Sequence, residues 1–268
     1  MINIPIFIGG QMKSGTTMFR MMLSRHTNIY SGLETYWFLD DLYINYNISN
    51  NKSIIKLQGF YNVSNSDIKK IIKVTNNNKK PFIHNFFNHI LSTNSKKRWL
   101  EKTPDNLKYL NLINENWKEY KFIHVLRDFR DIYASWKLSN KYDLNYFINQ
   151  VHTSYEPNLY ILGKETDQYQ EVKYENIIAN RNYEVRRNLS FLGEYFETKC
   201  TELDLKNSIK EFETVYKFSG KKSNTLISNQ EKINNNKIGH YKTVLSNEEV
   251  FIIEKELKNY FNLFEYEI

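Results

Sequence analysis

The stretch IFIGGQMKSGTT, from Ile6 to Thr17, combines the patterns of a buried strand, a glycine turn and a helix start. Gly10 and Gly15 have the spacing of the two glycines in the phosphate-binding pattern G-x-x-x-x-G-K-[ST]. Backbone N–H groups at a helix N-terminus, neighbouring hydroxyls and a permissive glycine all favour a bound phosphate. The sequence therefore predicts a phosphate-binding loop between the first strand and the first helix.

The cation of this loop is displaced from its usual place. Thr16 follows the second glycine, where the pattern requires lysine, and Lys13 stands three residues earlier. The loop therefore lacks the lysine that reaches the β- and γ-phosphates of a triphosphate. The sequence also shows no evident acidic partner for Mg²⁺. These features favour a nucleotide with one terminal phosphate over ATP or GTP.

The length of the chain allows one α/β domain or two small ones, and its basic balance favours anionic partners. The chain has 268 residues, 41% of them hydrophobic, and 37 basic against 30 acidic side chains give a net charge of +7. Cys200 is the single cysteine, so neither a disulfide framework nor a cysteine metal cluster is expected. The chain shows no secretory leader pattern and no apolar run of membrane-spanning length. We expect a cytoplasmic, soluble protein with no transmembrane segment.

Predicted strands alternate with predicted helices along the chain. Strands are predicted over 4–8, 98–102, 121–126 and 169–174, and helices from 16 and over 82–91, 107–117, 129–138, 144–156, 158–166, 184–192 and 246–261. Such alternation favours a parallel sheet that is covered on both faces. We therefore predict one α/β domain over residues 1–268, with a P-loop-like three-layer fold and a central, mostly parallel sheet flanked by helices. Two polar stretches, about 45–80 and 219–236, are interpreted as inserts.

A second candidate loop reads VLRDFRDIYASW, from Val125 to Trp136, and follows a predicted strand. Arg127 leaves that strand, and Ser135 lies eight residues further on, two turns into the next helix. A guanidinium and a hydroxyl placed in this way can grip a phosphate from two sides. The alternative is that Arg127 and Arg130 pair with the neighbouring aspartates in a surface charge cluster.

The two loops together, KSGTT and RDFRDIYAS, resemble those of the family of sulfotransferases that use 3′-phosphoadenosine 5′-phosphosulfate (PAPS). Four more segments agree in order, namely WLEKTP (99–104), VKYEN (172–176), FLG (191–193) and GHYK (239–242). The likeness is greatest to the bacterial and Golgi-like branch, with some resemblance to tyrosylprotein sulfotransferases. It implies a P-loop-like α/β fold that transfers the sulfuryl group of PAPS to a hydroxyl or amine of an acceptor. The nucleotide product would be 3′,5′-adenosine bisphosphate.

The resemblance also implies roles for individual residues. The 5′-phosphosulfate would be held by Lys13, Ser14, Gly15, Thr16 and Thr17. Arg127 and Ser135 would hold the 3′-phosphate, and Tyr174 would lie near the adenine. During transfer, negative charge builds on the oxygen that bridges phosphorus and sulfur. A cation inside the loop, here Lys13, can neutralise that charge, so no metal is required.

The resemblance leaves a choice of catalytic base. Cytosolic members use a histidine, whereas the tyrosylprotein and Golgi-like branches use a glutamate. The segment SGLET is similar to the GEET of the tyrosylprotein branch, so Glu34 is the predicted base. The alternative is that Glu34 stabilises the N-terminus of a helix over 36–43. Lys102 is predicted to assist at the transferring group, or alternatively to pair with Glu101 or Asp105.

The chain departs from the cytosolic members at two places. Those members carry R-K-G shortly before G-x-W-K to bind the 3′-phosphate, whereas this chain has asparagine at 234–236. Lys237 follows directly and is the predicted substitute. Met18 stands where those members have tryptophan. His84, His89 and His124 are the weaker alternatives for the base: the first two are interpreted as structural or surface residues, and His124 is expected to be packed within a strand.

The acceptor and two other functions stay open at the level of sequence. A carbohydrate or a small metabolite is the preferred acceptor. A kinase-like P-loop phosphotransferase would be indicated by turnover with Mg²⁺ and ATP. A non-catalytic nucleotide- or RNA-binding protein would be indicated by salt-sensitive RNA binding without PAPS affinity. No ladder of basic and aromatic residues is present, so a nucleic acid partner is not expected.

Overall fold

The computed structural model describes residues 4–37, 58–75, 79–139, 143–203, 209, 213–214, 217 and 237–268. The chain forms two compact units. The first comprises Met1–Phe7, Thr17–Thr103 and Phe196–Ile233, and the second comprises Ile8–Thr16, Pro104–Tyr195 and Asn234–Ile268. Residues 45–57, 76–78 and 219–236 of the two predicted inserts lie outside the described residues. The single domain over residues 1–268 stays a prediction.

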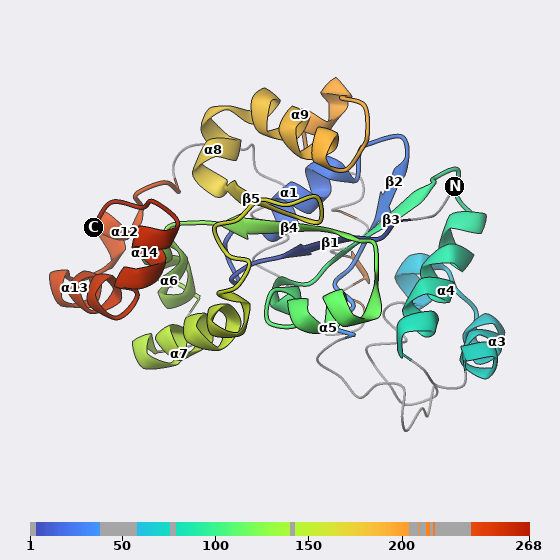
Figure 1. Cartoon of the computed structure of the whole chain (residues 1–268), viewed down its shortest axis with the longest axis horizontal. Coiled ribbons are helices and arrows are strands. Elements are labelled where there is room, and N and C mark those ends of the chain that lie inside the picture. The colour runs from blue at the N-terminus through green and yellow to red at the C-terminus, as the bar shows by residue number, and fades with distance from the viewer. Residues whose placement is uncertain are drawn as a thin grey trace. The chain divides into compact units, whose positions relative to one another are not determined.

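The described strands form one five-stranded sheet in the order β2-β3-β1-β4-β5 (Figure 1). Their bounds are Ile6–Gly9 for β1, Ile29–Ser31 for β2, Arg98–Lys102 for β3, Lys121–Leu126 for β4 and Tyr169–Lys173 for β5. β2 pairs with β3, and β4 with β5, both in parallel, with Ile29 opposite Arg98 and Phe122 opposite Tyr169. The predicted α/β class with a parallel sheet flanked by helices is confirmed.

The first unit is built on an aromatic core. Its helices are α1 (Thr16–Leu23, whose first residue belongs to the second unit), α3 (Asn65–Thr75) and α4 (Lys79–Ser92), and α4 packs on both α3 and β3. Apolar residues recur along α4 at helical spacing, so one face of the helix is buried. From that face, Phe87 stacks on Trp99 with ring centroids 4.5 Å apart, and Phe86 meets Trp37 edge-on at 5.0 Å. Aromatic packing of this kind fixes α4 against the strand.

The second unit has helices on both faces of β4 and β5. Its helical elements are η2 (Pro104–Asn106), α5 (Leu110–Asn116), α6 (Phe129–Lys137), α7 (Leu144–Tyr155), η3 (Glu156–Asn158), α8 (Tyr174–Ala179), α9 (Arg181–Phe191), α12 (Tyr241–Val244), α13 (Asn247–Glu256) and α14 (Lys258–Leu263). Figure 1 shows α8 and α9 on one side of these strands and α5 and α7 on the other. α12 and α13 pack on α6. The layered arrangement expected from alternating strands and helices is present within this unit.

The prediction of a helix over residues 158–166 is wrong. Residues 159–163 form turns, and Gly163 has the left-handed φ of +74°. No helix continues beyond η3, which ends at Asn158. The side-chain amide of Asn158 donates to the carbonyls of Leu107 and Ser154, at 2.7 and 2.9 Å. A buried asparagine that bonds to backbone carbonyls in this way fixes a turn in place of a further helical segment.

The C-terminal helix is correctly placed but is divided in two. Ser246 forms the expected N-cap, and it is part of a capping box in which its hydroxyl accepts from the N–H of Glu249. α13 ends at Glu256, and α14 begins at Lys258 after the non-helical Leu257. In the described part of the chain, no helix has both the length and the apolar character needed to span a membrane.

Candidate active site

The loop after β1 requires glycine at both of its motif positions. Gly10 and Gly15 have φ angles of +151° and +102°, which residues with a side chain rarely adopt. A Cβ at Gly10 would lie 2.4 Å from the carbonyl oxygen of Val125, and a Cβ at Gly15 would lie 2.6 Å from the ring of Tyr174. The glycine spacing seen in the sequence therefore reflects two close approaches of the backbone, to β4 and to the start of α8.

Lys13 is held in a strained conformation at the tip of this loop. Its φ is +77°, an uncommon value for a residue other than glycine. Two side chains from the segment Val125 to Trp136 donate to the backbone carbonyls of Met12 and Lys13. The indole of Trp136 donates to Met12 at 2.9 Å, and the Arg127 guanidinium donates to Lys13 at 3.1 Å. Strain that is maintained in this way is typical of ligand-binding sites.

Three buried donors in this region have no hydrogen-bond partner among the described residues. They are the hydroxyl of Ser14, the side-chain amide nitrogen of Gln11 and Nε of Arg127. A buried polar atom without a partner is costly, so such atoms are rare in folded proteins. All three carry N–H or O–H groups, which are the groups that bind phosphate or sulfate oxygens. These residues therefore fit an anionic nucleotide.

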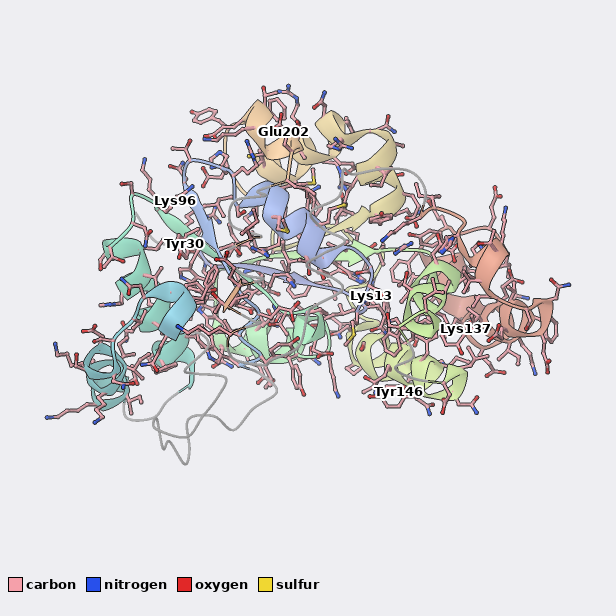
Figure 2. All side chains as sticks on the ribbon, turned by 180° about the vertical axis from the view of Figure 1, so that it is seen from behind. Lys13, Tyr30, Lys96, Lys137, Tyr146 and Glu202 are labelled. Carbon is pink, nitrogen blue, oxygen red and sulfur yellow. The ribbon has the colours of Figure 1, made fainter. Side chains whose placement is uncertain are left out.

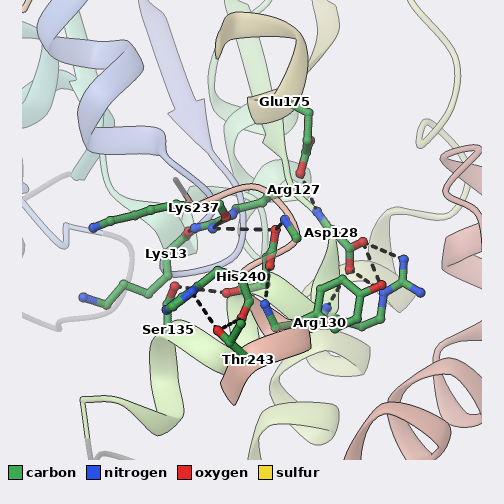
Figure 3. Close-up of polar contacts among 12 residues, drawn as sticks. Lys13, Arg127, Asp128, Arg130, Ser135, Glu175, Lys237, His240 and Thr243 are labelled. Atoms are coloured by element: carbon green, nitrogen blue, oxygen red, sulfur yellow. Dashed lines mark hydrogen bonds and ion pairs between the residues drawn. The ribbon is translucent and has the colours of Figure 1, made fainter. Parts of the chain in front are cut away.

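Arg127 connects three segments of the second unit (Figure 3). Its side chain is 5% exposed and its guanidinium carbon lies 4.6 Å from the centre of the Tyr174 ring. Besides the bond to Lys13, it donates to the backbone oxygen of Lys237 at 2.6 Å. In Figure 3 the side chains of Lys13 and Lys237 extend in the same direction. The structure thus brings together four of the predicted nucleotide-binding residues.

Ser135 lies on α6, half-buried, where its hydroxyl donates to the backbone oxygen of Asp131 at 3.0 Å. The charged residues around it are paired, as the alternative interpretation required. Arg130 lies 2.7 Å from Asp128, and Arg127 lies 3.9 Å from Asp131. That interpretation placed the charge cluster on the surface, which is wrong, because none of these four residues is more than 9% exposed.

The segment GHYK, residues 239–242, is fastened to α6 through Asp131. The carboxylate of Asp131 accepts from the backbone N–H groups of Gly239 and Tyr241, at 2.8 and 2.9 Å. Burial raises the pKa of Asp131, against these hydrogen bonds and the nearby Arg127 cation, which lower it. The guanidinium of Arg130 also lies over the Tyr241 ring at 4.6 Å. The predicted C-terminal element therefore packs on the helix that follows Arg127.

The first unit contains the predicted base. Lys102, on β3 and 2% exposed, forms an ion pair with Glu34, so the pairing with Glu101 or Asp105 that was considered from sequence is wrong. The Lys102 ammonium also donates to the hydroxyl of Thr17 at 2.8 Å. The hydroxyl of Tyr36 donates to the second carboxylate oxygen of Glu34. A carboxylate, an ammonium and two hydroxyls thus form one cluster at the end of the phosphate-binding loop.

The alternative role of Glu34, at the N-terminus of a helix, depends on residues 36–43. Residues 38–43 of the predicted helix over 36–43 lie outside the described residues. Tyr36 has a left-handed φ of +55°, so it does not continue a right-handed helix from Glu34.

Glu101 is a buried carboxylate that sequence reasoning missed. It is 3% exposed, and one of its oxygens accepts from the hydroxyls of Thr35 and Thr103, each at 2.8 Å. The backbone N–H of Thr35 donates to the same oxygen at 3.3 Å. Glu101 therefore fixes the segment that carries Glu34. The available signal was the alternation along β3, which points Glu101 and Lys102 to opposite faces.

His124 is packed, as expected. It is fully buried on β4, with Nδ1 2.7 Å from the hydroxyl of Tyr169 and Nε2 3.3 Å from that of Tyr155. His84 and His89 lie on α4, where His89 is 3.8 Å from Asp67. These contacts agree with structural roles for His124 and His89.

A model of the Sulfotransferase family matches residues 5–198. The chain belongs to the sulfotransferase family. The matched segment includes the phosphate-binding loop, Glu34, Lys102, Arg127 and Tyr174. The resemblance predicted from the two loops is therefore confirmed, and with it a sulfotransferase activity.

Solved structures show that this sulfotransferase has the fold of other members. The sulfotransferase domain of the Synechococcus PCC 7002 olefin synthase overlaps with a TM-score of 0.66 at 16% identity, covering 99% of this chain and 96% of that one. The sulfotransferase domain from the curacin biosynthetic pathway gives 0.64 at 17%, covering 96% and 98%. Sulfotransferase STF9 from Mycobacterium avium gives 0.56 at 10%, covering 100% and 78%. Among curated proteins, no sequence is significantly similar to this sulfotransferase.

Replacing Gly15 with alanine should destabilise the sulfotransferase by about 3 kcal/mol. The substitution adds backbone strain of about 1–2 kcal/mol and an overlap with the Tyr174 ring that costs about as much again. The matched control is Gly193→Ala, since Gly193 has a φ of +73° but no atom within 4 Å of an added Cβ. That variant should lose only about 1 kcal/mol. Equal losses in urea unfolding would show that the loop does not pack on Tyr174.

Proposed function

We propose that this sulfotransferase moves the sulfuryl group of PAPS to a hydroxyl or an amine of its acceptor by in-line transfer, with Glu34 as the base. One observation carries the proposal. Lys102 contacts both Glu34 and Thr17, so a carboxylate and an ammonium are fixed at the last residue of the phosphate-binding loop. A proton acceptor and a cation at that place are what sulfuryl transfer needs.

The donor nucleotide would be held mainly by the second unit. In this proposal Lys13, Ser14, Gly15, Thr16 and Thr17 bind the 5′-phosphosulfate, Arg127 and Ser135 bind the 3′-phosphate, and Tyr174 lies near the adenine. The buried Ser14 hydroxyl and the Arg127 Nε support this assignment, because each offers a hydrogen to an anion. Lys237 is the proposed second cation for the 3′-phosphate. Its backbone contact with Arg127 keeps it beside that guanidinium.

The chemistry follows from the positions of the proposed groups. Glu34 takes the proton of the acceptor as the acceptor atom forms its bond to sulfur. The bond from sulfur to the bridging oxygen breaks, and 3′,5′-adenosine bisphosphate leaves with the electron pair. The ammonium groups of Lys13 and Lys102 supply the positive charge that stabilises this leaving group. The acceptor must therefore present an O–H or N–H group, and we propose a carbohydrate or a small metabolite.

Calorimetric titration with 3′,5′-adenosine bisphosphate, beside ATP with Mg²⁺, tests the donor site. We expect the bisphosphate to bind and ATP to bind weakly. Arg127→Ala should weaken the bisphosphate at least about tenfold, because a charge-assisted hydrogen bond is lost. Arg186→Ala, which removes an exposed arginine of the same unit, should leave the affinity unchanged.

The opposite pattern would contradict the proposed donor. A preference for ATP with Mg²⁺ would favour a kinase-like phosphotransferase. Bisphosphate affinity that is equal in the Arg127 and Arg186 variants would remove Arg127 from the nucleotide site.

A further inference from the structure

Both carboxylate oxygens of Glu34 are held by a donor. The Lys102 ammonium contacts Oε1, and the Tyr36 hydroxyl donates to Oε2. Lys102 belongs to β3, whereas Tyr36 follows Glu34 by two residues in the chain. A carboxylate that is held at both oxygens has a fixed orientation, yet it keeps lone pairs for a further donor.

Tyr36 reaches Glu34 through an uncommon backbone conformation. Its φ of +55° lies in the left-handed region, where a bulky aromatic residue is rarely found. The conformation is fastened to the residue that follows β3, because the backbone N–H of Tyr36 donates to the Thr103 hydroxyl at 3.3 Å. That hydroxyl in turn donates to Glu101 at 2.8 Å. The fold thus maintains strain at the residue whose hydroxyl contacts the proposed base.

We propose that Tyr36 is a positioning residue that, together with Lys102, sets the orientation and the proton affinity of the Glu34 carboxylate. This inference rests on the proposed role of Glu34 as the base. A hydrogen bond to the charged form of a carboxylate favours that form. Tyr36 therefore keeps Glu34 ionised and aimed when the acceptor arrives, at some expense of base strength.

The described groups that face this carboxylate agree with that role. Lys102 on β3 supplies the positive charge, and the Thr17 hydroxyl on α1 accepts a hydrogen bond from the same ammonium. Glu101 also lies on β3, and its carboxylate accepts hydrogen bonds from the hydroxyls of Thr35 and Thr103. Of these donors, the Tyr36 hydroxyl can be removed with the least change in shape and charge.

Carbon-13 NMR of protein labelled at the glutamate carboxyl carbons tests the proposal without any acceptor. The Glu34 signal is identified by its loss in Glu34→Gln, and its titration midpoint is compared in wild type and in Tyr36→Phe. We expect the midpoint to rise by about one pH unit in Tyr36→Phe, because the carboxylate loses a donor. The matched control is Tyr30→Phe, which removes the hydroxyl of a half-buried tyrosine on β2 of the same unit (Figure 2). That midpoint should be unchanged.

The rate of bisphosphate release from PAPS, measured against pH, supplies a second readout. In Tyr36→Phe the acid limb should move to higher pH in parallel with the NMR midpoint, and kcat should change more than KM. A midpoint equal to that of the wild type would overturn the proposal, since Tyr36 would then have no effect on the carboxylate. If Glu34 were not the base, Glu34→Gln would show wild-type turnover. The two failures can be distinguished, because the NMR midpoint does not depend on turnover.

Discussion

Replacing Glu34 with glutamine is expected to lower the kcat of sulfuryl transfer by about 10²- to 10⁴-fold. The amide keeps the size of the side chain and can still accept a bond from Lys102, but it cannot take the proton of the acceptor. The affinity for 3′,5′-adenosine bisphosphate should stay unchanged, because the proposed nucleotide contacts are made mainly by residues of the second unit. A loss confined to kcat would identify a role in the chemical step.

The measurement is the transfer of labelled sulfuryl from PAPS to a panel of sugars, alcohols, phenols and amines. Glu202→Gln is the matched control, since Glu202 lies in the same unit, pairs with Arg25 at 3.2 Å and has a side chain that is 70% exposed. It should retain full activity. If Glu34→Gln retained most of the wild-type rate with every acceptor, another group would have to be the base.

Lys102 extends this test, because it acts on the same carboxylate. Lys102→Met should also lower kcat, and the double variant with Glu34→Gln should be little slower than the slower single variant. Residues that act as one unit show such non-additive losses. Additive losses would indicate that Lys102 and Glu34 act independently.

Local sequence patterns predicted four of the five described strands but missed β2, which has only three residues. The limits of β3 and β4 were predicted to the residue: β4 is largely an apolar and aromatic run, and β3 ends at the turn Thr103-Pro104. Arg127 and Tyr174 approach the phosphate-binding loop, in agreement with the rule that ligands bind beyond the carboxyl ends of parallel strands. These features depend on near neighbours in the chain or on simple topology.

The contacts within the candidate site could not be predicted in the same way. Lys102 and Glu34 are 68 residues apart in the chain. No local pattern shows that Lys102 pairs with Glu34 and not with Glu101, which precedes it in the chain. The left-handed turn at Tyr36 has no glycine or asparagine to announce it. Lys237 was predicted for its ammonium, whereas the structure shows its backbone oxygen in contact with Arg127. Such pairings are decided by tertiary packing.

Replacing Arg130 with methionine should destabilise the protein by about 3–5 kcal/mol, the usual cost of removing one partner from a buried ion pair. Arg130 is 8% exposed; its Nε and Nη2 donate to the carboxylate of Asp128, and its Nη1 donates to Glu254 at 2.6 Å. Burial acts to lower the pKa of Arg130, but the bonds to Asp128 and Glu254 outweigh it and raise that pKa. The substitution would leave Asp128 charged and largely buried without its partner.

Lys137 provides the matched control on the same helix. It also connects α6 to α13, through an ion pair with Glu249 at 2.7 Å, but its side chain is 42% exposed. Lys137→Met should therefore cost less than about 1 kcal/mol, and raising the salt concentration to about 1 M should remove that difference. In urea unfolding, the loss in Arg130→Met should persist at high salt, because a buried pair is poorly screened. Losses of similar size in the two variants would mean that burial does not distinguish these ion pairs, and that the contact between α6 and α13 is held by the apolar residues around them.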